Sequence, residues 1–146
     1  MTNTMQDMRA ESDELFMKQV LEVAKDATCD RAHVGAIIAR GSYILSTGVN
    51  TSARGLPTCK EEGHLMIDGH CCRTIHAEAN AIYDALERFT LERCTLYVTH
   101  EPCVHCRKLI IQSGIKRVVF LNLYRSLDVG RQICGDVEWI HYNSGL

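Results

Sequence analysis

The sequence lacks the long apolar runs that a membrane-spanning helix requires. None of its 146 residues lies in a stretch approaching the roughly 20 apolar residues of a bilayer span, and residues 1–14 are polar and acidic, without the apolar core of a secretory signal. Repeats, low-complexity runs and a Pro/Gly-rich linker are also missing. We therefore expect one domain over residues 1–146, with residues 1–11 flexible, in the cytoplasm or, for a viral protein, in the host cytoplasm, and no membrane partner.

An excess of basic residues is missing as well. Sixteen lysines and arginines face 18 aspartates and glutamates, which gives a formal net charge of −2. Such a chain has no general positive field for a nucleic-acid polymer, although a small basic pocket can still hold one phosphate. Cysteine and histidine, by contrast, are abundant, with eight and seven residues. In a reducing compartment such cysteines bind metal or lie buried more often than they form disulfides.

Apolar periodicity predicts an alternation of helices and strands. Helices are expected over 12–27, 77–89, 104–113 and, weakly, 127–133, and strands over 34–39, 43–49, 95–99, 117–121 and 137–142. The first two strands read as an antiparallel hairpin, whereas the later helical crossovers favour parallel pairing. The pattern predicts an α/β fold, a three-layer α/β/α sandwich with a mixed five-stranded sheet. Residues 50–73 lack periodicity, and so long a loop is typically functional or fixed by a metal.

One group of residues has the composition of a catalytic zinc site. His76 and Glu78 stand at the start of a predicted helix, and Cys103 and Cys106 follow at the start of the next one. One imidazole and two thiolates leave the fourth position of a zinc ion open to water. Cysteines three residues apart share a helix face, and the positive end of the helix dipole favours their thiolates. Pro102 suits this helix start because it has no N–H to leave unpaired. His76, Cys103 and Cys106 are the predicted ligands.

Glu78 is the predicted catalytic residue. Two thiolates and a neutral imidazole leave the site with a formal charge near zero, so zinc alone acidifies its water weakly and a base must help. The expected chemistry is attack of the activated water on the amino-bearing carbon of a flat heterocycle, with Glu78 carrying the proton to the ring nitrogen and to departing ammonia. His76 must lie at the edge of its helix, because residues two apart within a helix point to nearly opposite sides.

The pair of motifs, His-x-Glu and Pro-Cys-x-x-Cys, resembles the signature of the zinc-dependent nucleobase deaminases. Over about residues 29–123 the chain is similar to the cytidine and deoxycytidylate deaminase superfamily, and most to deoxycytidylate deaminases of bacterial and phage type. The stretches that carry this resemblance are 34–38, 48–50, 54–59, 69–71, 73–82 and 112–116. The resemblance implies a cytidine deaminase-like fold and zinc-dependent hydrolytic deamination of dCMP to dUMP, which feeds thymidylate synthesis.

The resemblance also implies how substrate and effectors bind. Asn50, Ala77 and Tyr124 would be substrate-binding residues, with Asn50 on the deoxyribose, although Asn50 can also be a turn residue and Tyr124 a packing aromatic. Relatives are often homohexamers that dCTP activates and dTTP inhibits, with magnesium, which places Asn50 and Arg54 in an effector loop. Here residues 48–55 lack the Tyr, the second Gly and the Pro of that loop, and Thr51 cannot adopt positive φ without strain. A loop of different shape is expected.

A second, structural zinc is a further implication of the resemblance. Its ligands would be Cys29, Cys59 and His70, with Cys71 or Cys72 as the fourth. Four such ligands would close the tetrahedron and order residues 50–73. The alternative is that these are reduced buried or surface thiols, which is our interpretation of Cys94 and Cys134. The remaining histidines near loops and helix starts are interpreted as solvated or hydrogen-bonded: His33, His64, His100 and His105.

Two other functions stay open at this point. A tRNA-editing or free-base deaminase would use the same zinc and glutamate, but it would be expected to have a basic surface or a shorter loop before His76. A noncatalytic zinc-binding interaction module would keep the ligands, yet it would need no carboxylate such as Glu78 beside an open coordination position.

Overall fold

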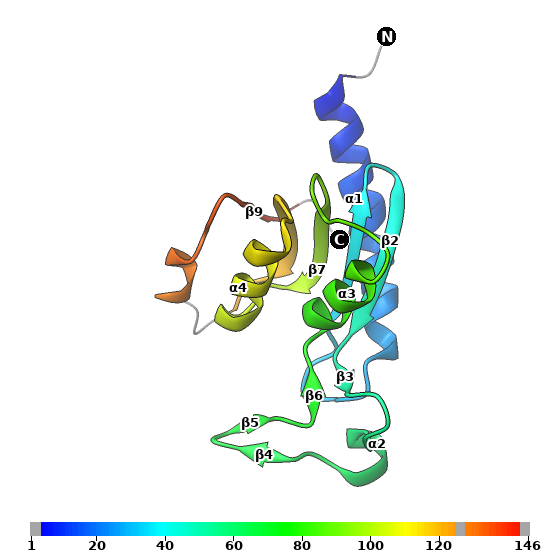
Figure 1. Cartoon of the computed structure of the whole chain (residues 1–146), viewed down its shortest axis with the longest axis vertical. Coiled ribbons are helices and arrows are strands. Elements are labelled where there is room, and N and C mark those ends of the chain that lie inside the picture. The colour runs from blue at the N-terminus through cyan, green and yellow to red at the C-terminus, as the bar shows by residue number, and fades with distance from the viewer. Residues whose placement is uncertain (1–3, 125–127, 144–146) are drawn as a thin grey trace.

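The computed structural model describes residues 4–124 and 128–143. Its centre is a five-stranded sheet in the order β2-β1-β7-β8-β9 (Figure 1). The strands are β1 (Gly35–Arg40), β2 (Tyr43–Val49), β7 (Thr95–His100), β8 (Arg117–Asn122) and β9 (Glu138–His141). β1 pairs antiparallel with β2 and β7, whereas β7 with β8 and β8 with β9 are parallel. The predicted mixed five-stranded sheet is confirmed.

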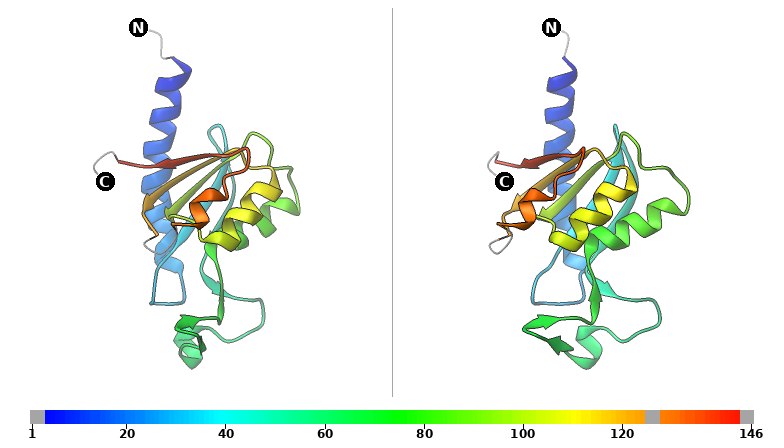
Figure 2. Two further views of the ribbon diagram at one scale, coloured as in Figure 1. Left: turned by 90° about the vertical axis from the view of Figure 1, so that its left-hand side faces the viewer. Right: turned by 60° about the vertical axis from the view of Figure 1, so that its left-hand side comes forward.

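Helices cover both faces of this sheet (Figure 2). α1 (Met5–Val23) packs on one face, and α3 (Ala77–Leu86) and α4 (Val104–Ser113) pack on the other. The predicted three-layer sandwich is therefore confirmed. Within the described ranges no helix combines the length and the apolar character needed to cross a bilayer.

The central strands are apolar throughout because both of their faces are buried. In β1, Ala36 and Ile38 join the core under α3 and α4, whereas Ile37 and Ala39 join the core under α1. The same alternation runs through the neighbouring strands, with Leu96, Val98, Val118 and Phe120 on one side and Tyr97 and Val119 on the other. Since successive side chains of a strand point to opposite faces, a strand between two helical layers needs apolar residues at every position.

α1 begins seven residues before the start predicted at residue 12. Thr4 caps it: the Thr4 hydroxyl accepts from the Asp7 N–H, and the Asp7 carboxylate accepts from the Thr4 N–H. The helix passes at Ala24 into the short 3₁₀ helix η1 (Ala24–Asp26). Residues 5–11 are thus helical and mostly exposed, and the flexibility of 1–11 stays a prediction.

A buried polar group attaches α1 to the sheet. Asp13, in the middle of the helix, accepts hydrogen bonds from the Tyr97 hydroxyl at 2.7 Å and from the Arg117 guanidinium at 2.7 and 2.5 Å. Tyr97 stands on β7 and Arg117 on β8, so one carboxylate joins the helix to two strands. Burial, and then the hydrogen bond to Asp13, raise the pKa of Tyr97.

The other predicted boundaries differ little from the structure. α4 covers the predicted residues and ends at Gly114, which caps it in the left-handed region with φ of 92°. α3 ends three residues before the predicted 89. In place of the weak helix predicted over 127–133, the structure has only the 3₁₀ helix η2 (Gly130–Gln132). Residue 127, the first of the predicted helix, lies outside the described residues.

Residues 50–73 contain several short elements in place of the featureless loop that periodicity suggests. The strand β3 (Thr51–Ser52) pairs with β6 (Thr74–Ile75), and β4 (Met66–Ile67) pairs with β5 (His70–Cys71). Between β3 and β4 lies one turn of helix, α2 (Cys59–Glu62), capped by Thr58 and Glu61. Figure 1 shows α2, β4 and β5 as a small lobe beyond the end of the main sheet. Elements this short have little hydrophobic core of their own.

Gly48 allows α3 to lie directly on β2. A Cβ atom at this position would come within 2.3 Å of the Ala77 carbonyl oxygen and 2.6 Å of the Ala81 amide nitrogen. The absence of a side chain therefore brings the amino-terminal turn of α3, which carries the predicted functional residues, against the sheet.

Candidate active site

Two helix starts define the site. His76 is the N-cap residue of α3, with extended backbone angles (φ −63°, ψ 150°), and Cys103 is the N-cap residue of α4. The His76 side chain makes no capping hydrogen bond to its own helix. His76 thus lies at the edge of its helix, as its spacing to Glu78 predicts, and its ring is available for other partners.

The three predicted zinc ligands lie together. The His76 Nδ1 atom lies 3.5 Å from the Cys103 Sγ atom and 3.4 Å from the Cys106 Sγ atom. One imidazole nitrogen and two sulfurs within 4.8 Å of one another form a donor set that fits a tetrahedral zinc ion with one position left for another ligand. Cys106 is buried and Cys103 half-buried.

Hydrogen bonds and burial within this cluster shift the pKa values of all three side chains. A hydrogen bond from Cys106 lowers the pKa of Cys103, burial raises it, and His76 lowers it further. The result is a pKa of about 3. The same hydrogen bond, burial and the negative charge of Glu78 raise the pKa of Cys106. The hydrogen bond to Cys103 raises the pKa of His76. One sulfur is therefore a thiolate, the form that binds a metal.

Glu78 lies in the first turn of α3 and is only 4% exposed. Burial raises its pKa, against the lowering effects of a backbone N–H and of His76. A carboxyl group with a raised pKa exchanges protons near neutral pH more readily than an ordinary glutamate does. It has the character that a proton-transferring residue requires.

Glu78 lines one cavity of about 640 Å³ together with two of the ligands, His76 and Cys103. The predicted substrate residues Asn50, Ala77 and Tyr124 line it too. The side chain of Asn50 also holds the loop before β1, since its oxygen accepts from the Val34 N–H at 2.8 Å and its nitrogen donates to the Ala32 oxygen at 2.7 Å. Arg54, predicted in the effector loop, is exposed and does not line this cavity.

A second cluster of metal-binding side chains lies in the small lobe. Its members are Cys29, Cys59, His64 and Cys71, whose ligand atoms lie within 4.8 Å of one another. The Cys29 Sγ atom lies 3.5 Å from the His64 Nδ1 atom, and the Cys59 and Cys71 sulfurs are 3.6 Å apart. Three sulfurs and one imidazole are a donor set typical of structural zinc.

His64 occupies the place in this cluster for which the sequence indicated His70. His70 and Cys71 are adjacent in β5, and adjacent residues of a strand point to opposite faces, so both cannot reach the same point. His70 lines the large cavity instead. Of the two cysteines left open, Cys71 joins the cluster, whereas Cys72 is exposed and its thiol donates to the Leu65 oxygen.

His64 directly follows Gly63, the C-cap residue of α2, whose φ of 80° is one that favours glycine. Its other ring nitrogen, Nε2, lies 2.9 Å from an Asp30 carboxylate oxygen. An imidazole that binds a metal usually donates its second N–H to such a carboxylate. Burial raises the pKa of Cys71, but hydrogen bonds from Arg73 and Leu65 outweigh it and lower this pKa to about 6. His64 was not among the predicted ligands, because no local motif marks it.

The remaining cysteines and histidines lie outside both clusters. All eight cysteines are free of disulfides, with Cys94 in the core and Cys134 exposed, as predicted. His100 accepts or donates a 2.8 Å hydrogen bond to the Thr99 hydroxyl, and burial lowers its pKa. His100 and His105 both line the large cavity, which the sequence analysis did not anticipate.

Comparison with known proteins agrees with this geometry. Residues 10–122 match the family described as the cytidine and deoxycytidylate deaminase zinc-binding region. ComE operon protein 2 of Bacillus subtilis (strain 168) is 45% identical over 113 residues, which cover 76% of this chain and 59% of that protein. The deoxycytidylate deaminase of Mycobacterium phage D29 is 36% identical over 123 residues, which cover 77% of this chain and 95% of that protein.

Among solved structures, the crystal structure of dCMP deaminase from the cyanophage S-TIM5, in complex with dCMP and dUMP, is similar with a TM-score of 0.74. The two chains are 31% identical, and the match covers 89% of this chain and 97% of that one. The family match spans most of the sheet, both helix starts and all three residues of the His76 cluster. The chain belongs to the cytidine and deoxycytidylate deaminase zinc-binding family.

Proposed function

We propose that this protein is a zinc-dependent deaminase that hydrolyses dCMP to dUMP and ammonia. The observation that carries the proposal is the position of Glu78, a buried carboxyl group in the same cavity as two members of the zinc-ligand cluster, His76 and Cys103. A purely structural metal site has no need of this carboxyl group. The relatives named deoxycytidylate deaminase support the choice of substrate.

The roles of the residues follow from their chemistry. His76, Cys103 and Cys106 would hold the zinc ion, which when bound supplies Lewis-acid activation of the attacking water. Glu78 accepts one proton of that water and passes it to the ring nitrogen of cytosine. It then takes the second proton from the hydroxyl group added to the ring carbon and delivers it to the amino group, which leaves as ammonia. The raised pKa that burial gives Glu78 favours both the uptake and the release of the proton.

A nucleoside monophosphate fits the polar lining of the cavity. Three residues that line it together with Glu78 carry N–H donors: Arg31, His70 and His105. Arg31 donates one hydrogen bond to the Gly69 oxygen at 3.2 Å, which leaves its other N–H groups free for an anion. A phosphate would find these donors, whereas cytosine or deoxycytidine would leave them unused. This favours dCMP over the free base and the nucleoside.

Ammonia release from dCMP, deoxycytidine, dCTP and cytosine tests the proposal. We expect dCMP to have the highest kcat/KM, and Arg31→Ala to lower it by about tenfold or more, as expected for one charged hydrogen bond to phosphate. Arg88→Ala is the matched control, because Arg88 is exposed and lies outside the cavity. A higher kcat/KM for cytosine or deoxycytidine would contradict dCMP as the substrate.

We also propose that Cys29, Cys59, His64 and Cys71 hold a structural zinc ion. The Asp30 carboxylate at 2.9 Å from the His64 Nε2 atom supports this, since it would fix the ring with Nδ1 directed at the metal. A homohexamer and regulation by dCTP and dTTP with magnesium, implied by the resemblance, stay predictions.

A further inference from the structure

Glu101 is a buried carboxylate between the sheet and the zinc-ligand loop, and other residues of the chain hold both of its oxygens. It follows β7 directly, precedes Pro102 and Cys103, and is 4% exposed. One of its oxygens accepts from the Tyr124 N–H at 3.0 Å and from Arg131 at 2.8 Å, and the other accepts from Arg131 at 2.9 Å. Because the protein already occupies both oxygens, Glu101 is not free to move a proton, although it lines the cavity.

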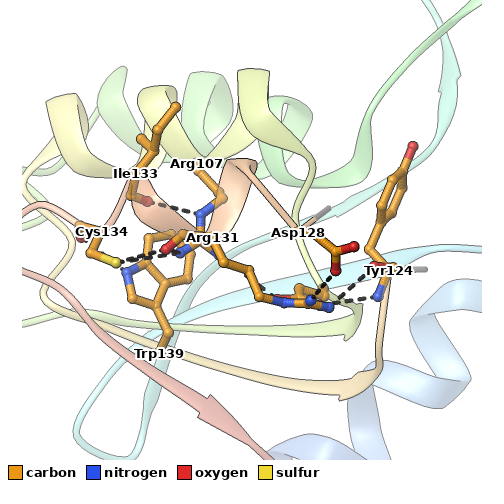
Figure 3. Close-up of polar contacts among 8 residues, drawn as sticks. Arg107, Tyr124, Asp128, Arg131, Ile133, Cys134 and Trp139 are labelled. Atoms are coloured by element: carbon orange, nitrogen blue, oxygen red, sulfur yellow. Dashed lines mark hydrogen bonds and ion pairs between the residues drawn. The ribbon is translucent and has the colours of Figure 1, made fainter. Parts of the chain in front are cut away.

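Arg131 connects this carboxylate to Tyr124. Figure 3 shows Arg131 directed toward Asp128 and Tyr124. Its guanidinium donates two hydrogen bonds to Glu101, one to the Tyr124 carbonyl oxygen at 3.2 Å and one to Asp128 at 3.2 Å. The backbone of Tyr124 is therefore bound on both sides, through its N–H by Glu101 and through its carbonyl by Arg131. Only a planar guanidinium fork offers so many donors in fixed geometry.

A second arginine ties the same carboxy-terminal segment to α4. Arg107 follows the ligand Cys106 directly and is 2% exposed. It donates to the Ile133 carbonyl at 2.8 Å, and its guanidinium stacks on the Trp139 ring at 3.8 Å from the ring centre (Figure 3). η2, which carries Arg131, is thereby held against the helix that carries the zinc ligands.

We infer that Arg131 is a positioning residue, which through Glu101 fixes the backbone of Tyr124 and with it one wall of the substrate cavity. The inference rests on the proposed function, since it takes that cavity as the substrate site. Arg131 lies beyond residue 122, where the family match ends. The side chains of the described residues give Tyr124 no other backbone hydrogen bond.

The test is a double-mutant cycle of Arg131→Gln and Tyr124→Ala. If Arg131 acts through Tyr124, Arg131→Gln raises the KM for dCMP by about tenfold and changes kcat by less than about threefold. The KM of the double variant is then no higher than that of Tyr124→Ala alone. Zinc content stays that of the wild type. Additive effects, or loss of zinc from Arg131→Gln, would overturn the inference.

Lys116→Gln is the matched control. Lys116 pairs with Asp136 at 3.2 Å, so it also attaches the carboxy-terminal segment to the sheet, but through an exposed pair away from the cavity. This variant should keep the KM of the wild type. Should Arg131→Gln fail to fold, Arg131→Lys carries the test: it keeps a charge beside Glu101 but not the fork, so KM should still rise, and a wild-type KM would refute the role.

Hydrogen exchange separates this inference from the choice of substrate. The Tyr124 amide, which donates to Glu101, should exchange at least about tenfold faster in Arg131→Gln than in the wild type or in Lys116→Gln. Failure of the wild type to deaminate dCMP would overturn the proposed function alone. Unchanged exchange at Tyr124 would overturn the positioning role, whatever the substrate.

Discussion

Gly48→Ala should impair the active site without changing any residue in it. A Cβ at this position would lie 2.3 Å from the Ala77 oxygen and 2.6 Å from the Ala81 nitrogen, where ordinary contact begins at 3.4 Å. Both neighbours are backbone atoms of α3, so they cannot be relieved by a rotamer change. The amino-terminal turn of α3 would have to move by about 1 Å away from β2, and Glu78 and His76 would move with it.

The size of the effect follows from this displacement. Overpacking of this kind typically costs about 1–3 kcal/mol of the free energy of unfolding. A displacement of about 1 Å in a catalytic group can cost about 100-fold in rate. We therefore expect a loss of about 100-fold in kcat/KM for ammonia release, which exceeds what partial unfolding at this modest destabilisation could produce, because the folded form still predominates.

Gly41→Ala is the control, because it affects the same hairpin without touching α3. Gly41 has φ of 59° and nothing within 4 Å of an added Cβ, so the substitution strains only the turn. Its cost of about 1–2 kcal/mol is similar to that expected for Gly48→Ala. Urea unfolding and ammonia release should show two variants of similar stability, of which only Gly48→Ala loses activity. Equal activity of the two would refute the argument that Gly48 sets the position of α3.

Two further predictions concern the metal sites. Glu78→Gln should keep its zinc and lose ammonia release from dCMP by several orders of magnitude, because the amide cannot carry the proton; retained turnover would reject the role of Glu78. Zinc analysis of the wild type should give about two ions per chain, falling to about one in His64→Ala and staying at about two in His70→Ala. Loss of a zinc ion from His70→Ala but not from His64→Ala, or one zinc ion per chain in the wild type, would contradict the structural site as proposed.

The predicted strands and the functional helices α3 and α4 were found close to their expected boundaries because their signals are local. Continuous apolar runs such as 117–121 indicate strands buried on both faces, and Pro102 and Gly114 mark the two ends of α4. The start of α1 was predicted wrongly although its capping residue, Thr4, is equally local. There the exposed and polar first turns of the helix carry no apolar stripe, so periodicity gave no sign of them.

The sequence by itself determined the chemistry of the catalytic cluster. Four residues stand at helix starts, where a few neighbouring residues set the backbone geometry: His76, Glu78, Cys103 and Cys106. Their donor types alone indicate an open zinc position beside a proton-transferring carboxyl group. The sequence also predicts that the two helix starts meet, because the two motifs together supply the ligands of one zinc ion.

Only the tertiary structure decided which residues complete the rest of the site. His64 joins the second cluster and His70 does not. The alternation of side chains along β5 separates His70 from its neighbour Cys71. The contact of Arg131 with Glu101 joins residues 30 positions apart through side chains alone. Such contacts depend on how complete elements pack in space, and no periodicity or short motif along the chain encodes that packing.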